Sequence, residues 1–257
     1  MPETMTLEAP ADVDFDLEIP RPDISHLITE TEEAVDNIIS EKQMRLLTEP
    51  LYSSRSDVTD EHGEPRQFAV FANVGLYFGL HEPHLVPDVM LSLDVQVPDD
   101  PSPKEHRTYL CWEYGKVPDV VIEIVSNRKG KEDGSKMLDY ARGRIEYYVI
   151  YDPEAWLSND ALRVYELRGR RYVRRRDFRL PYTRLALTLW QGEYEGNTRT
   201  WLRWCDAQGL PIPAGAERAV VAEERAVVAE ERAATAEEKA IRFAAKLREL
   251  GLDPEQV

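Results

Sequence analysis

Cysteine is scarce in this sequence, with only two among 257 residues. Cys111 and Cys205 stand in no CxxC or Cys/His spacing, so the sequence indicates neither a disulfide framework nor a zinc site. No run approaches the roughly 18 apolar residues that span a bilayer, and the start of the chain lacks the pattern of a signal peptide. We therefore expect a soluble, cytoplasmic protein with two reduced, packed cysteines and no membrane partner.

Basic charge is also in short supply, with 32 lysines and arginines against 48 acids and a net charge of −16. Such a balance argues at first against a nucleic-acid partner, because polyanion binding depends on lysine and arginine. The excess of acidic residues is confined mainly to the N-terminal part of the chain, however. Residues 1–65 hold 17 acids and 4 bases, whereas residues 66–215 hold 21 of each. The net charge of the whole chain therefore does not exclude nucleic-acid binding by its middle part.

The order of patterns along the chain predicts a mixed α/β fold with a mixed β-sheet core flanked by helices. Residues 1–24 are acidic and rich in proline, which predicts a disordered tail. Apolar spacings of 3, 4 and 7 predict an amphipathic helix within residues 24–47. Short apolar or alternating runs over residues 68–125 predict strands. We place the folded domain at residues 25–212.

The second half of that domain continues the alternation of helices and strands. A helix that carries Tyr140 as a core aromatic ends at Gly143. A buried strand follows at residues 147–151, and alternation on both sides of residues 168–170 predicts a hairpin.

The last segment, residues 213–257, repeats with a period of seven and predicts a long helix. Two series of small or apolar residues form a heptad seam, with arginines and glutamates flanking it. In a parallel pair of helices these charges would be complementary, which favours a homodimer through this segment; a single solvated helix is the alternative. The a series is Ala219, Ala226, Ala233, Ala240 and Leu247, and the d series is Ala222, Ala229, Ala236, Phe243 and Leu250.

Residues 117–126 form the strongest candidate for chemistry, a strand that is apolar on both faces and still carries two carboxylates. A buried carboxylate must be hydrogen-bonded, neutralised or bound to metal. Glu123 therefore needs a partner, and Asp119 lies roughly 13 Å along the same strand, too far to share a cation.

Asp88 opens another apolar strand and supplies that second acid. If the two strands are neighbours, Asp88 and Glu123 could together hold Mg²⁺ or Mn²⁺. A nearby lysine would complete the site by orienting water or stabilising developing charge; we favour Lys136, with Lys129 and Lys131 as alternatives. Without a metal, Asp88 and Asp119 would be turn residues, and Glu123 would pair with an arginine.

The stretch from Pro118 to Pro153, together with the looser segment over residues 68–95, resembles the Uma-two family (domain of unknown function 820). This family is restriction-endonuclease-like and belongs to the PD-(D/E)XK nuclease superfamily. The resemblance implies that Asp88 and Glu123 are the motif acids and Mg²⁺ ligands. Val125 replaces the usual motif lysine, and Lys136 matches a lysine that the family carries on the neighbouring helix.

Nine arginines within residues 163–184 face only two acids there. Such a basic hairpin could contact phosphates, with Arg170, Arg171, Arg174, Arg175 and Arg176 as weak candidates. Alternatively, its arginines pair with the acidic N-terminal segment.

The sequence as a whole favours a metal-dependent endonuclease that hydrolyses DNA, with Asp88, Glu123 and Lys136 as catalytic residues. The alternative is a catalytically inactive nuclease fold that binds nucleic acid or serves as a scaffold, and Val125 is the feature that favours it.

Overall fold

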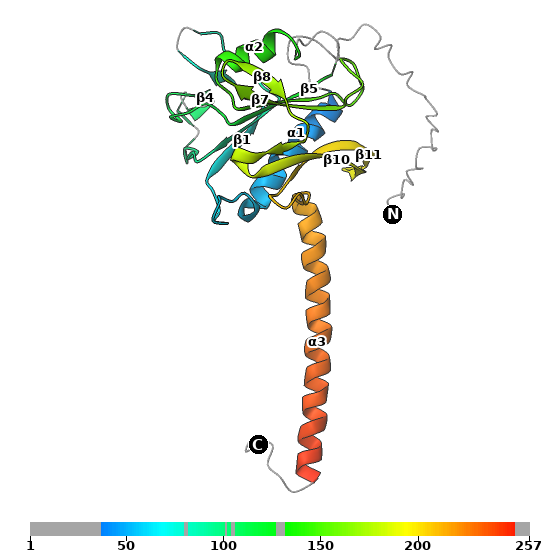
Figure 1. The fold of residues 1–257 in the computed structure, drawn as a ribbon. Coiled ribbons are helices and arrows are strands. Elements are labelled where there is room, and N and C mark those ends of the chain that lie inside the picture. The colour runs from blue at the N-terminus through cyan, green and yellow to red at the C-terminus, as the bar shows by residue number, and fades with distance from the viewer. Residues whose placement is uncertain (1–36, 80–81, 101, 104–105, 127–131, 250–257) are drawn as a thin grey trace, which may run out of the picture.

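The computed structural model describes residues 37–79, 82–100, 102–103, 106–126 and 132–249. These residues form a mixed α/β protein with a long C-terminal helix, as the sequence predicts (Figure 1). In chain order the elements are α1 (Ile38–Ser53), the 3₁₀ turn η1 (Arg55–Asp57), β1 (Phe68–Ala72), β2 (Leu76–Tyr77), β3 (Val89–Leu93), β4 (Tyr109–Leu110), β5 (Val120–Ile124), α2 (Ser135–Arg142), β6 (Tyr147–Tyr151), β7 (Leu162–Arg168), β8 (Arg171–Arg174), β9 (Arg179–Leu180), the 3₁₀ turn η3 (Pro181–Thr183), β10 (Leu185–Tyr194), β11 (Asn197–Cys205) and α3 (Gly215–Glu249).

The main sheet has six strands in the order β1-β3-β5-β6-β7-β8. All neighbours in it are antiparallel except β5 and β6, which are parallel. A parallel pair needs a crossover connection, and α2 provides it. Strands β3, β5 and β6 are buried along their whole length, which explains why their sequences are apolar on both faces.

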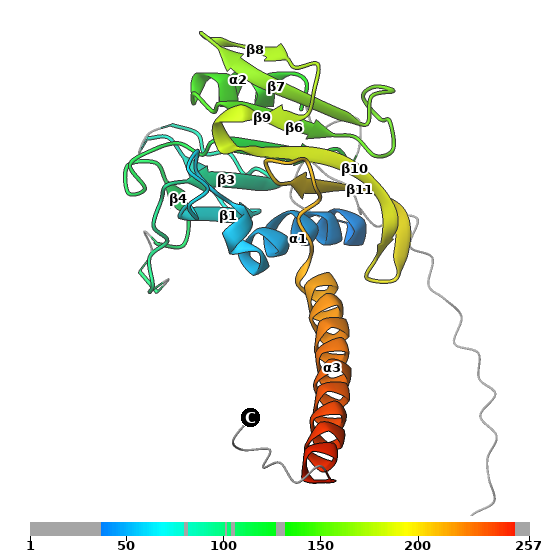
Figure 2. The same cartoon turned by 60° about the horizontal axis from the view of Figure 1, so that its bottom comes forward.

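Two layers cover the main sheet, one on each face (Figure 2). On one face, α1 and the small sheet β11-β10-β9 enclose a core that includes Leu47, Ile122 and Trp204. On the other face, α2 covers a second core that includes Val121, Tyr140 and Tyr148. Trp201 and Trp204 are fully buried, as expected for packing residues near the end of the domain.

Helix α1 differs from the predicted helix at its C-terminal end. It begins after Asn37, whose side chain accepts hydrogen bonds from two backbone N–H groups of the first turn. It continues past Leu47 to Ser53 because Pro50 and Leu51 are buried against the core. The predicted helix end at residue 47 is therefore wrong, and the predicted start near residue 24 lies outside the described residues.

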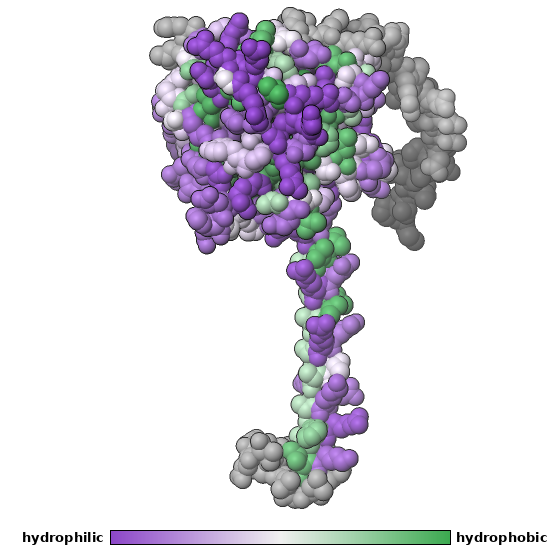
Figure 3. All heavy atoms as spheres, in the orientation of Figure 1, coloured by the Kyte–Doolittle hydropathy of each residue, from purple (hydrophilic) through white to green (hydrophobic). Residues whose placement is uncertain are grey.

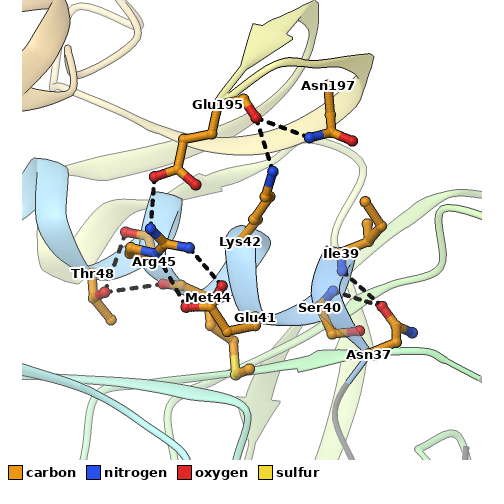
Figure 4. Close-up of polar contacts among 10 residues, drawn as sticks. All are labelled: Asn37, Ile39, Ser40, Glu41, Lys42, Met44, Arg45, Thr48, Glu195 and Asn197. Carbon is orange, nitrogen blue, oxygen red and sulfur yellow. Dashed lines mark hydrogen bonds and ion pairs between the residues drawn. The ribbon is translucent and has the colours of Figure 1, made fainter. Parts of the chain in front are cut away.

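Helix α1 is held against the hairpin of β10 and β11, which the sequence analysis did not identify (Figure 4). Lys42 Nζ donates to the backbone oxygen of Glu195 at 2.8 Å, and Arg45 pairs with the Glu195 carboxylate at 2.7 Å. The buried Gln43 side chain bonds both the N–H and the C=O of Leu202, which supplies the edge of β11 with hydrogen-bond partners. These contacts fix the position of α1 relative to β10 and β11.

Helix α3 is bound to the body through its first turn and projects from it (Figure 1). Glu217 pairs with Arg203 at 2.6 Å, and the N–H of Gly215 donates to Glu49 at 3.1 Å. Figure 3 shows apolar side chains exposed along the helix. No described helix combines the length and the apolar content that crossing a membrane takes. Cys111 and Cys205 are free thiols, as predicted.

Candidate active site

The carboxyl end of β5 brings the two predicted acids together. Strands β3 and β5 are antiparallel neighbours with Val89 opposite Ile122, so the next step of this register sets Asp88 opposite Glu123. Asp88 Oδ2 accepts a hydrogen bond from the backbone N–H of Ile124 at 2.5 Å. The prediction that these two strands are adjacent is confirmed, and the acids converge at one strand end.

The Glu123 carboxylate is fully buried and is bound by two side chains of α2. Lys136 Nζ lies 2.9 Å from Oε2, and the Tyr140 hydroxyl donates to Oε1 at 2.6 Å. Lys136 and Tyr140 are four residues apart, so they share one face of the helix. These two bonds offset the cost of burying the charge. The alternative in which an arginine neutralises Glu123 is wrong.

Lys136 lies between two acids and keeps part of its side chain exposed. Its ammonium is 2.9 Å from Glu123 and 3.9 Å from Glu132. Burial by itself lowers the pKa of Lys136, but the charges of Glu123 and Asp88 raise it above its ordinary value of 10.5. Lys136 is therefore a fixed cation at neutral pH. The alternative lysines, Lys129 and Lys131, lie outside the described residues.

Two residues of this cluster have roles that the sequence analysis missed. Tyr140 is a core aromatic, as expected, but its hydroxyl also fixes Glu123; burial and then the Glu123 charge raise the pKa of Tyr140 well above 10.0. Glu132 is buried, and its Oε2 has no hydrogen-bond partner among the described residues. Burial raises the pKa of Glu132 above 4.5, against the opposing charge of Lys136. Glu132 and Tyr140 are each four residues from Lys136, and this spacing could have predicted that they lie beside it on a helix.

Other acids on the main sheet have structural roles. Asp119 accepts from the backbone N–H of Leu93 at 2.7 Å and pairs with Lys116 at 2.7 Å. Asp152 is fully buried and accepts from three backbone N–H groups in the turn after β6. Val125 is buried in the α2-side core, so no cation comes from the position of the usual motif lysine.

The residues at the end of β5 suit a hard divalent cation. Asp88 and Glu123 present carboxylate oxygens, the donors that Mg²⁺ prefers, and each Glu123 oxygen that accepts one hydrogen bond has a second lone pair. In the described part of the chain, no three His, Cys, Asp or Glu residues gather closely enough to form an all-protein cage. Mg²⁺ is commonly held by one or two carboxylates with several waters. The donor set therefore fits Mg²⁺ or Mn²⁺.

The arginine-rich hairpin forms as predicted, with Gly169 in a left-handed turn between β7 and β8. Seven of the nine arginines in residues 163–184 fall into three groups. Arg163 is buried near Asp152, which removes it from any exposed basic surface. Arg168, Arg174 and Arg175 pair with nearby acids. Arg170, Arg171 and Arg176 are exposed and have no ion pair within the described residues. The predicted pairing with the N-terminal acidic segment lies outside those residues.

A mixed sheet with two acids at one strand end and a lysine from the crossover helix is the arrangement that the resemblance to restriction-endonuclease-like proteins implies. Residues 41–189 match the profile of the Uma2 family, whose description is "Putative restriction endonuclease". The chain belongs to this family, as its resemblance implied.

One solved structure that the chain matches is described as "a putative nuclease belonging to DUF820" from Anabaena variabilis. The two chains are 17% identical, and the TM-score is 0.33. The match covers 53% of this chain and 64% of that one, which is less than two thirds of its length. No curated protein matches the chain.

Proposed function

We propose that this protein is a metal-dependent endonuclease that hydrolyses phosphodiester bonds in DNA. The observation that carries the proposal is the fully buried Glu123 carboxylate, which is shared by Lys136 and Tyr140 beside Asp88. A sheet core does not need a buried acid, a lysine and a second acid at one strand end in order to pack. Membership of the Uma2 family supports nuclease chemistry at this place.

Each residue of the cluster has a chemical task in this proposal. Asp88 and Glu123 would hold Mg²⁺ or Mn²⁺, which when bound polarises the phosphodiester and lowers the pKa of the attacking water. Lys136 stabilises the negative charge that develops on the phosphate, or orients the water. Tyr140 fixes the orientation of the Glu123 carboxylate, and so acts as a positioning residue.

Two further parts of the molecule fit a DNA substrate. The exposed Arg170, Arg171 and Arg176 would contact the phosphate backbone. A parallel coiled coil through α3 would join two copies, since its flanking charges are complementary only in that orientation. The cytoplasmic localisation expected from the sequence remains a prediction.

The proposal is tested with the purified full chain, plasmid DNA and a structured RNA, in Mg²⁺, in Mn²⁺ and in EDTA. We expect cleavage of DNA that requires the metal. Glu123→Gln should slow it by more than about 100-fold, the value of one preorganised electrostatic group in an active site. The matched control is Asp139→Asn, which removes an exposed carboxylate from the same helix as Lys136. The proposal fails if no nucleic acid is cut, or if Glu123→Gln cuts as well as the wild type.

Calorimetric titration of Mg²⁺ separates this function from the inactive alternative that Val125 favours. The wild type should bind Mg²⁺, and Asp88→Asn should weaken that binding. Equal heats for the two proteins would favour the inactive scaffold.

A further inference from the structure

We infer that a cavity beside the proposed active site receives an unpaired nucleobase of the substrate. The inference rests on the proposed function and names how the substrate is engaged. The cavity has a volume of about 640 Å³ and lies between the first turn of α1, the ends of β5 and β6, and β11. It is distinct from the cluster of Asp88, Glu123 and Lys136.

Three aromatic residues line this cavity, Tyr151, Trp156 and Trp201, and of these Trp156 is the one whose ring is exposed. Trp201 is fully buried, and its indole N–H has no acceptor in the part of the chain that the structure describes. A buried donor without an acceptor costs free energy unless a ligand satisfies it. An exposed indole ring and an unsatisfied N–H at one cavity are suited to a flat heteroaromatic ring that carries acceptor atoms.

Two charged side chains add polar recognition to the aromatic walls. Arg199 and Glu154 both line the cavity and pair with each other at 2.6 Å. The Arg199 guanidinium also lies 5.7 Å from the centroid of the Trp201 ring. A guanidinium donor and a carboxylate acceptor side by side are the groups that read the polar edges of bases.

The cavity lies directly behind the acidic strand end. Ile124, Val125 and Ser126 line it, and Glu123 immediately precedes them in the chain. Ile124 belongs to the α1-side core, whereas Glu123 is bound by α2 on the other face of the sheet. A nucleotide whose base enters the cavity would pass the end of β5, beside which Asp88 and Glu123 lie.

The opposite wall is preorganised by hydrogen bonds within the protein. The first turn of α1, which lines the cavity, is capped by Asn37 at 2.9 and 3.0 Å, and Lys42 ties the helix to Glu195 (Figure 4). A preformed pocket lowers the cost of binding a base that has left its stack.

The test measures nucleotide binding by the full chain in EDTA, so that it does not depend on cleavage. The probes are the four deoxynucleoside 5′-monophosphates, with deoxyribose 5-phosphate as the base-free control, followed by ligand-detected NMR. At least one nucleotide should bind, and the sugar phosphate should not. Trp156→Ala should weaken binding by about 5- to 150-fold, the range for loss of one base-stacking ring.

Trp112→Ala is the matched control, because Trp112 is 43% exposed against 39% for Trp156 and does not line the cavity. If Trp156→Ala does not fold, Ile38→Trp serves instead: Ile38 lines the cavity and is 75% exposed, so a larger ring there fills the space without disturbing the core. Binding by none of the four nucleotides, or equal binding by the cavity variant and Trp112→Ala, overturns the inference even if DNA is cut. Nucleotide binding without any cleavage would support the cavity and count against the proposed nuclease.

Discussion

A single buried carboxylate explains much of the local chemistry in this protein. Glu123 has no exposure, yet both of its oxygens are satisfied by α2. The proposed site needs a cation at this point in space, whichever position in the sequence supplies it. Lys136 supplies it from the helix, which is why Val125 can occupy a strand position that elsewhere carries lysine. The departure from the usual motif therefore leaves the charge of the cluster intact.

Tyr140→Phe tests whether this hydroxyl positions Glu123. The change keeps the ring in the core and leaves a buried carboxylate oxygen with one partner fewer, so the free energy of unfolding should fall by about 1–3 kcal/mol. DNA cleavage should fall as well, by an amount measured from initial rates at saturating Mg²⁺. Chemical denaturation gives the stability change.

Tyr148→Phe is the control for that experiment. Tyr148 is equally buried, and its ring lies tilted 5.3 Å from that of Tyr140, but its hydroxyl donates to the backbone oxygen of Glu132 at 2.7 Å and not to Glu123. It should lose about 1 kcal/mol of stability and keep its cleavage rate. Equal loss of rate in both variants would mean that Tyr140 acts only through packing.

At the scale of elements, the β7–β8 hairpin divides its arginines between structure and surface. Arg175 is held by Glu166 and Asp177, whereas Arg170 and Arg171 form the exposed end of the hairpin. Ion pairs within this segment therefore neutralise part of its excess of basic charge. Only the exposed, unpaired members remain for phosphate contacts.

The variant Arg170→Ala/Arg171→Ala/Arg176→Ala tests that division. Each phosphate contact contributes about 0.9 to the slope of log affinity against log salt, so the slope should become shallower by up to about 3. DNA binding is measured by fluorescence anisotropy at several salt concentrations with Glu123→Gln as the background. The same number of alanines at the exposed Arg55, Arg107 and Arg142 is the control. An unchanged slope in the hairpin variant would rule out this contact surface.

Sequence patterns predicted the elements whose signal is local. Alternation predicted the β7–β8 hairpin, and two Pro-Asp strand openings led to Asp88 and Glu123 as neighbours. Lys136 was favoured over Lys129 and Lys131, but its contact with Glu123 could not be predicted, because the packing of α2 decides which side chains reach the strand. Tyr140 could not be separated from an ordinary core aromatic. Pro50 inside α1 was missed because tertiary burial overrides its local preference.

At the scale of the whole molecule, the acidic charge lies mostly near the N-terminus, and a long helix projects from the folded body. Of the formal charge of −16, residues 1–65 carry −13, and the body that holds the site is nearly balanced. Helix α3 spans 35 residues, or about 50 Å at 1.5 Å per residue. Its apolar side chains have no partner within the described chain, and Phe243 is 73% exposed.

Phe243→Glu tests the proposed coiled coil. Phe243 is at a d position of the seam, so a buried charge there should dissociate the dimer to monomers in sedimentation experiments over a range of concentrations. Ile241→Glu is the control, since Ile241 is 65% exposed but lies off the seam; it should leave the dimer intact. A wild type that is monomeric at every concentration would refute the coiled coil.

The tight junction between α3 and the body has a further consequence for such a dimer. Glu217, Gly215 and Arg218 fix the first turn of the helix to the body, through Arg203, Glu49 and Ser54. The rotation of the body about the axis of α3 is then fixed relative to the side of the helix that carries the heptad seam. Deleting one residue of α3 between its first turn and the apolar end of the seam would rotate each body by about 100° about the helix axis. Deleting a whole heptad would rotate it by only about 20°. In such a dimer, the position of the seam around α3 would set the angle between the two proposed active sites on one DNA.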